Sequence, residues 1–331
     1  MATNRRIVLA SRPQGAASTS NFRLEEVPVP SLAPGQILVR NHWLSLDPYM
    51  RGRMNEGRSY AASQALDDVM VGGTAGEVVE SRNPAFAAGD KVVAYLGWQE
   101  YGVSDGTGVH KVDTRHVPLS AFLGPVGMPG VTAWYGLNRI IEPMQGQTVV
   151  VSAASGAVGS VVGQLARLGG CRAIGIAGGA AKCAYVTQEL LFDACIDYKS
   201  EDVGRRLKEV APDGVDGYFE NVGGEIMDAV LPRMNAFGRI ALCGMIAGYD
   251  GTPIPIRNPA WFLVSRLMMK GFIVSEHMDV WPAALKELGG HVASGRIKYR
   301  ESVASGIESA PQAFLGMLKG ANFGKQLVKL I

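Results

Sequence analysis

The chain has 331 residues, of which 47% are hydrophobic and 19% are charged. This length indicates two domains, and the composition allows a large buried core. The formal net charge of +2 excludes a strongly basic nucleic-acid or membrane-surface binder. Since no stretch approaches the ~20 apolar residues of a membrane span, and the N-terminal apolar run is too short for a signal peptide, we expect a cytoplasmic protein with no nucleic-acid or membrane partner.

The first 126 residues have the pattern of a β-rich domain. Short apolar runs are separated by segments rich in proline and glycine, which is typical of strands joined by turns. The predicted strands cover residues 7–10, 37–46, 72–80 and 91–97.

From residue 127 the chain alternates strand and helix patterns, which predicts a doubly wound parallel sheet. The expected strands are 148–153, 171–178, 193–198, 214–220, 238–246 and 269–275, and the expected helices are 155–168, 180–191, 200–212, 224–235 and 281–295. The tail returns to a strand, helix and strand pattern. We therefore predict an α/β fold in which a Rossmann-type domain, 127–294, is inserted into a discontinuous β-rich domain, 1–126 and 295–331.

A glycine loop follows the first of these strands and opens a helix, which is the context of a dinucleotide-binding loop. It matches the pattern GxGxxG with Ala154 in the first position. Gly156 would let the backbone approach a pyrophosphate, Gly159 would let helix and strand pack closely, and the helix N-terminus would supply free N–H groups. The alternative is a glycine turn without a cofactor.

The second expected strand of the Rossmann-type domain, 171–178, ends without an acidic residue. Such a residue normally accepts hydrogen bonds from the ribose hydroxyls of NAD. Gly178 and Gly179 leave room there, and Lys182 places a cation one turn further on. A cation in place of a carboxylate favours the 2′-phosphate of NADP. Tyr198, after the third strand, is a second candidate donor. Lys182 could instead be a solvated helix lysine, and Tyr198 an ordinary surface residue.

Several motifs in order resemble one family. They are LSLDPYMRGRM (44–54), GMPGVTAWYGL (127–137), AASGAVGSVVGQLA (153–166), YFENVGG (218–224), GRIALCG (238–244) and NFGKQLVK (322–329). Over essentially its whole length the chain resembles the zinc-independent medium-chain dehydrogenase/reductase superfamily. Within it, the chain is similar to prostaglandin reductases, plant 2-alkenal reductases and, above all, bacterial NADPH-dependent curcumin reductases. The β-rich domain is GroES-like in that family.

The resemblance implies NADPH as cofactor and a set of residues that bind it. The expected set is Pro48, Ala153, Ala154, Ser155, Gly156, Ala157, Val158, Gly159, Gly178, Lys182, Tyr198, Asn221, Cys243, Gly244, Ile246, Tyr249, Phe272, Ile273, Val274 and Asn322. Of these, Phe272, Ile273 and Val274 are expected to form a strand whose backbone holds the nicotinamide carboxamide. From the residues alone, Asn221 and Asn322 could be ordinary turn residues.

This sequence departs from the family pattern at two places. Tyr249 lies in AGYD, where relatives more often have Ser or Thr before the tyrosine and Asn after it. Leu191 stands where we would expect glycine.

We expect no metal site. The chain has no cysteine before Cys171, and Gly72 and Gly73 stand where zinc-dependent relatives have a His-Glu pair. The four cysteines, Cys171, Cys183, Cys195 and Cys243, show no CxxC spacing and are expected to be buried as small apolar residues.

The expected activity is reduction of the C=C bond of α,β-unsaturated aldehydes and ketones, including curcuminoids. This reaction needs an aimed alkene and hydrogen bonds to the developing enolate rather than a metal. Tyr249 is the expected catalytic donor, Tyr49 and Tyr249 are expected to bind the substrate, and Tyr49 is the rival donor. The alternatives are a quinone reductase and a non-catalytic NADPH-binding protein. An apolar edge strand at GFIVSEH (271–277) also predicts a homodimer.

Overall fold

The computed structural model describes residues 3–331 and divides them into two compact units. The first unit contains residues up to Leu123 and the segment Glu301–Ile331, and the second contains Gly124–Arg300. Among the described residues, no helix is long and apolar enough to cross a membrane.

The second unit is built on a six-stranded parallel sheet with the order β10-β9-β8-β11-β12-β13. Its strands are β8 (Thr148–Ser152), β9 (Arg172–Ala177), β10 (Ala194–Asp197), β11 (Val215–Glu220), β12 (Met234–Leu242) and β13 (Met268–Gly271). Numbered from β8, the order is 3-2-1-4-5-6, that of a doubly wound dinucleotide-binding sheet. The predicted Rossmann-type fold is confirmed.

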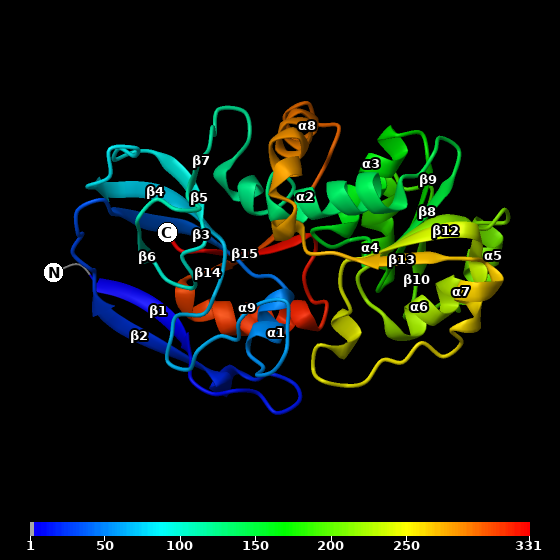
Figure 1. Cartoon of the computed structure of the whole chain (residues 1–331), viewed down its shortest axis with the longest axis horizontal. Coiled ribbons are helices and arrows are strands. Elements are labelled where there is room, and N and C mark those ends of the chain that lie inside the picture. Colours follow the sequence, from blue (N-terminus) through cyan, green and yellow to red (C-terminus); the bar gives the residue numbers. More distant parts are fainter. Residues whose placement is uncertain (1–2) are drawn as a thin grey trace. The chain divides into compact units, whose positions relative to one another are not determined.

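Helices cover both faces of this sheet, with α2 and α3 on one side and α6 on the other (Figure 1). The helices are α2 (Met128–Tyr135), α3 (Gly159–Leu168), α4 (Ala180–Ala184), α5 (Val203–Val210), α6 (Gly224–Val230), α7 (Ala260–Val264) and α8 (Trp281–Ala293), and the shorter or π-helical turns are η3 (Gly136–Ile141), η4 (Tyr185–Glu189), η5 (Leu231–Arg233), η6 (Ile246–Gly248), η7 (Val274–Glu276) and η8 (Met278–Val280). Because both faces are covered, the central strands are buried on both sides: all five residues of β8 are buried, and its three middle residues are valines.

The first unit contains a seven-stranded mixed sheet and a separate antiparallel pair, which confirms the predicted β-rich domain. The strands are β1 (Thr3–Leu9), β2 (Phe22–Pro28), β3 (Ile37–Ser45), β4 (Thr74–Ser81), β5 (Lys91–Ala94), β6 (Tyr101–Ser104), β7 (His110–Lys111), β14 (Glu301–Ser305) and β15 (Lys325–Lys329), and the helices are α1 (Tyr49–Arg53), α9 (Ala310–Leu318) and the turns η1 (Thr19–Asn21), η2 (Leu119–Leu123) and η9 (Ile307–Ser309). The C-terminal segment enters the sheet because β15 pairs with both β14 and β3.

An aromatic cluster lies in the core of the first unit. The Trp98 ring stacks on Phe22 at 5.4 Å between centroids and meets the edge of Phe314 at 5.6 Å. A Cβ atom at Gly72 would lie 2.9 Å from the Trp98 ring, so the close approach of backbone and indole requires glycine there.

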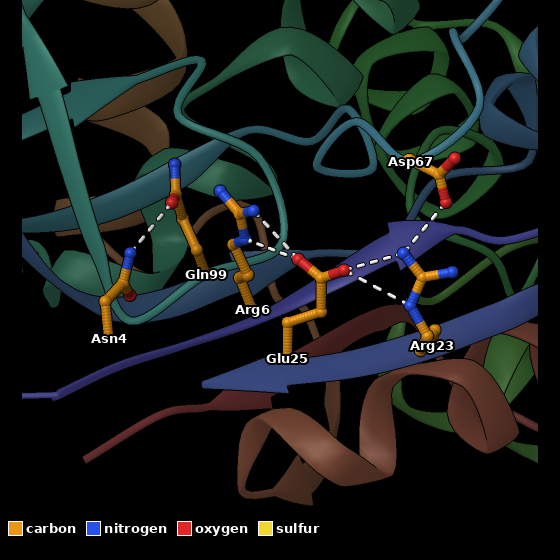
Figure 2. Close-up of polar contacts among 6 residues, drawn as sticks. All are labelled: Asn4, Arg6, Arg23, Glu25, Asp67 and Gln99. Atoms are coloured by element: carbon orange, nitrogen blue, oxygen red, sulfur yellow. Dashed lines mark hydrogen bonds and ion pairs between the residues drawn. The ribbon is translucent and has the colours of Figure 1, made fainter. Parts of the chain in front are cut away.

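The pair β1–β2 carries a group of charged contacts near its surface. Glu25 lies between two guanidinium groups, at 2.8 Å from Arg6 and 2.7 Å from Arg23, and Arg23 also reaches Asp67 at 2.8 Å (Figure 2). Nearby, the Asn4 amide donates to Gln99 at 3.1 Å. Surface ion pairs of this kind contribute at most about 1 kcal/mol each, so burial of the aromatic cluster is the larger stabilising contribution.

Candidate active site

The strand order reverses between β8 and β11, and ligands of doubly wound sheets bind at the carboxyl ends of the strands at that point. The predicted residue Asn221 lies there, directly after β11. Its side-chain amide donates to the Ser152 carbonyl at 2.8 Å, and its backbone N–H donates to Ser152 Oγ at 2.8 Å. These two hydrogen bonds join the carboxyl ends of β8 and β11, where the candidate cofactor site lies.

Glu220, at the end of β11, holds the ends of these strands together through hydrogen bonds. It was not among the residues predicted from the sequence. The side chain is completely buried, and its carboxylate accepts hydrogen bonds from Ser152 Oγ at 2.7 Å and from the backbone N–H of Gly223 at 3.0 Å. The Tyr218 hydroxyl donates to it as well. The sequence did contain a signal for Glu220, an acidic residue at the end of the apolar strand in YFENVGG. Such a residue is expected to be buried, and a buried carboxylate must be hydrogen-bonded.

The glycine loop 153–159 connects β8 to α3 with a tight turn. Ala153 adopts a φ of 50°, and its carbonyl accepts from the Gly156 N–H at 2.9 Å. A Cβ atom at Gly159 would lie only 2.5 Å from the Ala153 carbonyl oxygen, so glycine is required where helix and strand meet. Ala154, the substitute for the first glycine, is fully buried. The loop therefore leads into the N-terminus of α3, where the helix dipole favours an anion.

Four residues gather beyond the end of β9, where the ribose-binding acid is missing. A Cβ atom at Gly178 would lie 2.8 Å from the Tyr198 hydroxyl, so the phenol lies directly against the glycine backbone. Burial lowers the pKa of Lys182, and the charge of Lys199 lowers it further. Lys182 and Lys199 therefore place two cations near this turn, and only Lys182 was predicted from the sequence. Lys199 was within reach because it directly follows Tyr198.

An acid is nevertheless present nearby, because Asp197 ends β10. Its Oδ1 accepts from the Gly179 N–H at 2.7 Å and from the Lys199 N–H at 3.0 Å, and its Oδ2 accepts from Ser200 Oγ at 2.9 Å. The Gly179 bond is the main cause of the lowered pKa of Asp197. This carboxylate therefore stabilises the Gly178–Gly179 turn.

The loop after β12 brings a further predicted group to the same edge. The Cys243 N–H donates to the Glu220 carbonyl at 2.9 Å, and the Ile246 N–H donates to the Asn221 carbonyl at 3.2 Å. Tyr249 follows η6, and a Cβ atom at Gly244 would lie 3.3 Å from its hydroxyl. Desolvation raises the pKa of the Cys243 thiol to about 12, so this thiol is not a nucleophile near neutral pH.

The prediction of a strand at Phe272, Ile273 and Val274 is wrong. β13 ends at Gly271, Ile273 is extended, and Val274 begins η7. The Val274 carbonyl accepts from Trp281 Nε1 at 3.1 Å, and the Phe272 ring packs on Tyr135 at 5.4 Å and on Phe219 at 6.3 Å. These side-chain contacts turn the chain away from the sheet, which an apolar run cannot reveal.

In the first unit, a buried ion pair positions the predicted residues Pro48 and Tyr49. Lys325 Nζ on β15 bonds to Asp47 Oδ1 at 2.5 Å and to the Leu46 carbonyl at 2.8 Å, with both charged side chains buried. Pro48 directly precedes α1 and is its N-cap residue. The ion pair thus ties the segment before α1 to a strand 278 residues later in the chain.

The Tyr49 hydroxyl hydrogen-bonds to the Tyr95 hydroxyl in the same unit. Burial raises the pKa of Tyr49 well above its ordinary value and that of Tyr95 to about 12. Both phenols therefore stay protonated near neutral pH and can donate hydrogen bonds. Tyr95 lies in an expected strand and was not recognised as a polar neighbour of Tyr49.

Asn322 also belongs to the first unit, and it lies in the turn between α9 and β15. Its side-chain amide donates to the Gly324 carbonyl at 2.8 Å. It lines a cavity of about 360 Å³ together with residues of α9, β14 and β15. A cofactor contact of Asn322 stays a prediction.

The described residues, 3–331, contain no group of three or more His, Cys, Asp or Glu side chains arranged to hold a metal ion. The absence of a metal requirement stays a prediction from the sequence.

The comparisons with known proteins agree with this architecture. A family described as N-terminal domain of oxidoreductase matches residues 5–112, and one described as zinc-binding dehydrogenase matches residues 157–289. NADPH-dependent curcumin reductase of Escherichia coli is 46% identical over 99% of this chain and 97% of that protein. Prostaglandin reductase 1 of Rattus norvegicus is 44% identical over 96% of each chain. 2-alkenal reductase (NADP(+)-dependent) of Nicotiana tabacum is 40% identical over 98% of this chain and 97% of that protein.

Among solved structures, CurA from Vibrio vulnificus, also known in complex with NADPH, superposes with a TM-score of 0.93 at 46% identity over 99% of both chains. A doubly wound sheet with a glycine loop at its switch point, joined to a discontinuous β-rich unit, defines the class of medium-chain dehydrogenases/reductases. The chain belongs to the zinc-independent branch of this superfamily, in the group that contains these curcumin, prostaglandin and 2-alkenal reductases.

Proposed function

We propose that this protein uses NADPH to reduce the C=C bond of α,β-unsaturated aldehydes and ketones, including curcuminoids. The observation that carries the proposal is the cationic site at Gly178, Lys182, Tyr198 and Lys199, at the carboxyl edge of a dinucleotide-binding sheet. It fits a 2′-phosphate better than two free ribose hydroxyls, because the nearby Asp197 is engaged by Gly179 and Ser200. The names of relatives at 40–46% identity support the same cofactor and substrate class.

Several residues of the second unit are the proposed contacts of NADPH. The loop 153–159 and the N-terminus of α3 would hold the pyrophosphate, because a Cβ atom at Gly156 would meet only the Ala153 carbonyl oxygen, at 3.1 Å, and the backbone there is otherwise open. Asn221 would contact the ribose side, and Cys243, Gly244, Ile246 and Tyr249 would approach the nicotinamide. When bound, the cofactor supplies a hydride for the β-carbon of the substrate.

The chain itself must stabilise the charge that develops on the substrate's carbonyl oxygen. Tyr249 is the proposed donor, because a phenol remains protonated at neutral pH and its hydroxyl lies beside Gly244 at the sheet edge. Tyr49 is the second candidate, and its raised pKa keeps its proton available for donation. Either hydroxyl would bind the substrate oxygen and so lower the barrier.

We also propose that the chain forms a homodimer through the edge of the parallel sheet. β13 is the last strand of the sheet, and an unpaired edge strand invites pairing with another copy. Large apolar side chains around this edge are exposed, with Leu263 80% and Phe237 71% accessible. Val264 and Met268 extend the patch.

We propose a cytoplasmic location as well, which the four free thiols support.

The test of the activity is NADPH consumption with a panel of enals, enones, diarylheptanoids and quinones, run with and without a metal chelator. We expect saturated carbonyl products from the enals and enones and equal rates in chelator. Turnover of quinones alone would replace the proposal with a quinone reductase. Tight NADPH binding without any turnover would indicate a non-catalytic binding protein.

A further inference from the structure

Two cysteine side chains meet beneath the proposed phosphate site. Cys183 lies on α4 and Cys195 on β10, and their sulfur atoms are 3.2 Å apart. Neither is fully buried, whereas Cys171 is. The prediction that all four cysteines are buried is therefore wrong for this pair and for Cys243. The pair could not be found by CxxC spacing, because strand pairing and not sequence distance brings it together.

The surroundings leave room for the two sulfurs to approach each other. β10 pairs with β9 so that Cys195 lies opposite Gly175. A Cβ atom at Gly175 would lie 3.3 Å from the Cys195 sulfur, so the missing side chain keeps this space open. A disulfide has an S–S distance of about 2.05 Å. The two sulfurs therefore need to move by only about 1 Å in total, a shift that a short helix can absorb.

The hydrogen bond between the thiols makes them chemically different. Cys195 donates to the Cys183 sulfur, and this bond lowers the pKa of the Cys183 thiol and raises that of Cys195. The acids Asp197 and Glu201 act against ionisation of Cys183, but their effect is smaller than that of the bond. Cys183 is therefore the thiol that ionises first and attacks an oxidant, and Cys195 is the resolving thiol.

We propose that Cys183 and Cys195 are a redox site that forms a reversible disulfide when the protein meets hydrogen peroxide. The Cys183 thiolate attacks a peroxide oxygen and becomes a sulfenic acid, while the other oxygen leaves as water after taking up a proton. The Cys195 thiol then attacks the sulfenic sulfur, the S–S bond forms, and a second water leaves. Two thiols lose two electrons and two protons in total, and the peroxide accepts them. A dithiol reductant reverses the step.

The position of the pair couples this step to NADPH binding, a consequence that rests on the proposed function. Lys182 directly precedes Cys183, and Asp197, two residues after Cys195, holds the Gly179 N–H. Drawing α4 toward β10 shifts Lys182 relative to Tyr198 and the turn. The disulfide therefore weakens binding of the 2′-phosphate, while NADH binding, which does not use this site, stays unchanged.

The covalent step is tested by treating the full-length protein with hydrogen peroxide, alkylating the remaining thiols and digesting with trypsin. No lysine or arginine separates Cys183 from Lys199, so both cysteines fall in one peptide, while Cys171 and Cys243 fall in others. We expect this peptide to lose two hydrogen atoms and to resist alkylation until a dithiol is added. Cys183→Ser and Cys195→Ser must each abolish this product, and Cys171→Ser must not.

Two results would overturn the redox site. One is equal or faster oxidation of Cys243 or Cys171, and the other is oxidation of Cys183 to sulfinic acid with Cys195 still reduced. Both are read from wild-type protein, so they do not depend on whether the variants fold.

The coupling is tested by fluorescence titration of reduced and oxidised protein with NADPH and NADH. Partial loss of a charge-assisted hydrogen bond should weaken the binding of NADPH about 3- to 10-fold and leave the binding of NADH unchanged. Equal affinities for NADPH in the two states would remove the coupling but not the disulfide. Failure of the reduced protein to bind NADPH would contradict the proposed function, which the peptide map does not depend on.

Discussion

At the scale of single residues, Lys182 is the side chain on which the cofactor proposal most directly depends. It is half-buried, and burial and then the charge of Lys199 lower its pKa, so a phosphate bound beside it would be favoured. We expect Lys182→Ala to weaken NADPH by about 10- to 100-fold, the value of one charge-assisted bond, and to leave NADH nearly unchanged. Titration with both cofactors measures this. The matched control is Lys208→Ala on α5, which should change neither, and an equal loss for both cofactors would make Lys182 a structural residue.

Tyr249 carries the chemical proposal at the same scale. Removing only its hydroxyl with Tyr249→Phe should lower kcat by roughly 10- to 1000-fold, as for the loss of an oxyanion donor. NADPH affinity should change little, because the ring remains. Steady-state kinetics with one enone checks this, and Tyr49→Phe is the comparison. If kcat is unchanged in Tyr249→Phe and falls in Tyr49→Phe, the donor is Tyr49.

Leu191 shows that a departure from the family pattern has a local cost. Where glycine was expected, leucine adopts a φ of 62°, and its side chain is exposed. The left-handed region costs an L-residue about 1–2 kcal/mol. Glycine avoids this cost, but its greater conformational entropy in the unfolded state cancels part of the gain in stability. We expect Leu191→Gly to raise the free energy of unfolding by about 0.5–1 kcal/mol in denaturant titrations. Leu191→Ala keeps the Cβ atom and should give no gain, so a gain of the same size in alanine would contradict this explanation.

At the scale of elements, the Lys325–Asp47 ion pair joins β15 to the segment that begins α1. Burial lowers the pKa of Lys325, and the nearby Asp47 carboxylate opposes that shift. Removing one partner leaves a buried charge uncompensated, so Lys325→Ala should cost about 3–5 kcal/mol of stability. Chemical denaturation measures the loss. Lys329→Ala, at an exposed position of the same strand, should cost far less, and equal losses would show that the pair has no special role.

The elements also show why one strand boundary was misplaced. The sequence run MKGFIVS is apolar apart from Lys270 and Ser275 and predicts a strand to residue 275, but β13 ends at Gly271. Phe272 packs against Tyr135 and Phe219 instead. A short apolar run does not distinguish a strand from a packed loop, so only the tertiary contacts decided where pairing stops.

At the scale of the whole molecule, the exposed patch at Phe237, Leu263, Val264 and Met268 predicts association through β13. We expect light scattering at micromolar concentration to give the mass of a dimer. Leu263→Glu should shift the mass toward the monomer, because a charge would be buried in the interface without a partner. Leu191→Glu, an equally drastic change at an exposed apolar position on another part of the second unit, should leave the dimer intact. A monomeric wild-type protein would contradict the proposed interface.

The sequence by itself determined the fold class, the glycine loop and the missing ribose acid, because these depend on patterns within a few residues of one another. Only the tertiary structure decided that Lys199 joins Lys182, that Asp197 caps the Gly178–Gly179 turn, and that Glu220 holds Ser152 and Gly223 together. It also brought Asp47 to Lys325 and Cys183 to Cys195. Each of these contacts depends on the register and order of strands. Non-local pairing sets both, and no local spacing encodes them.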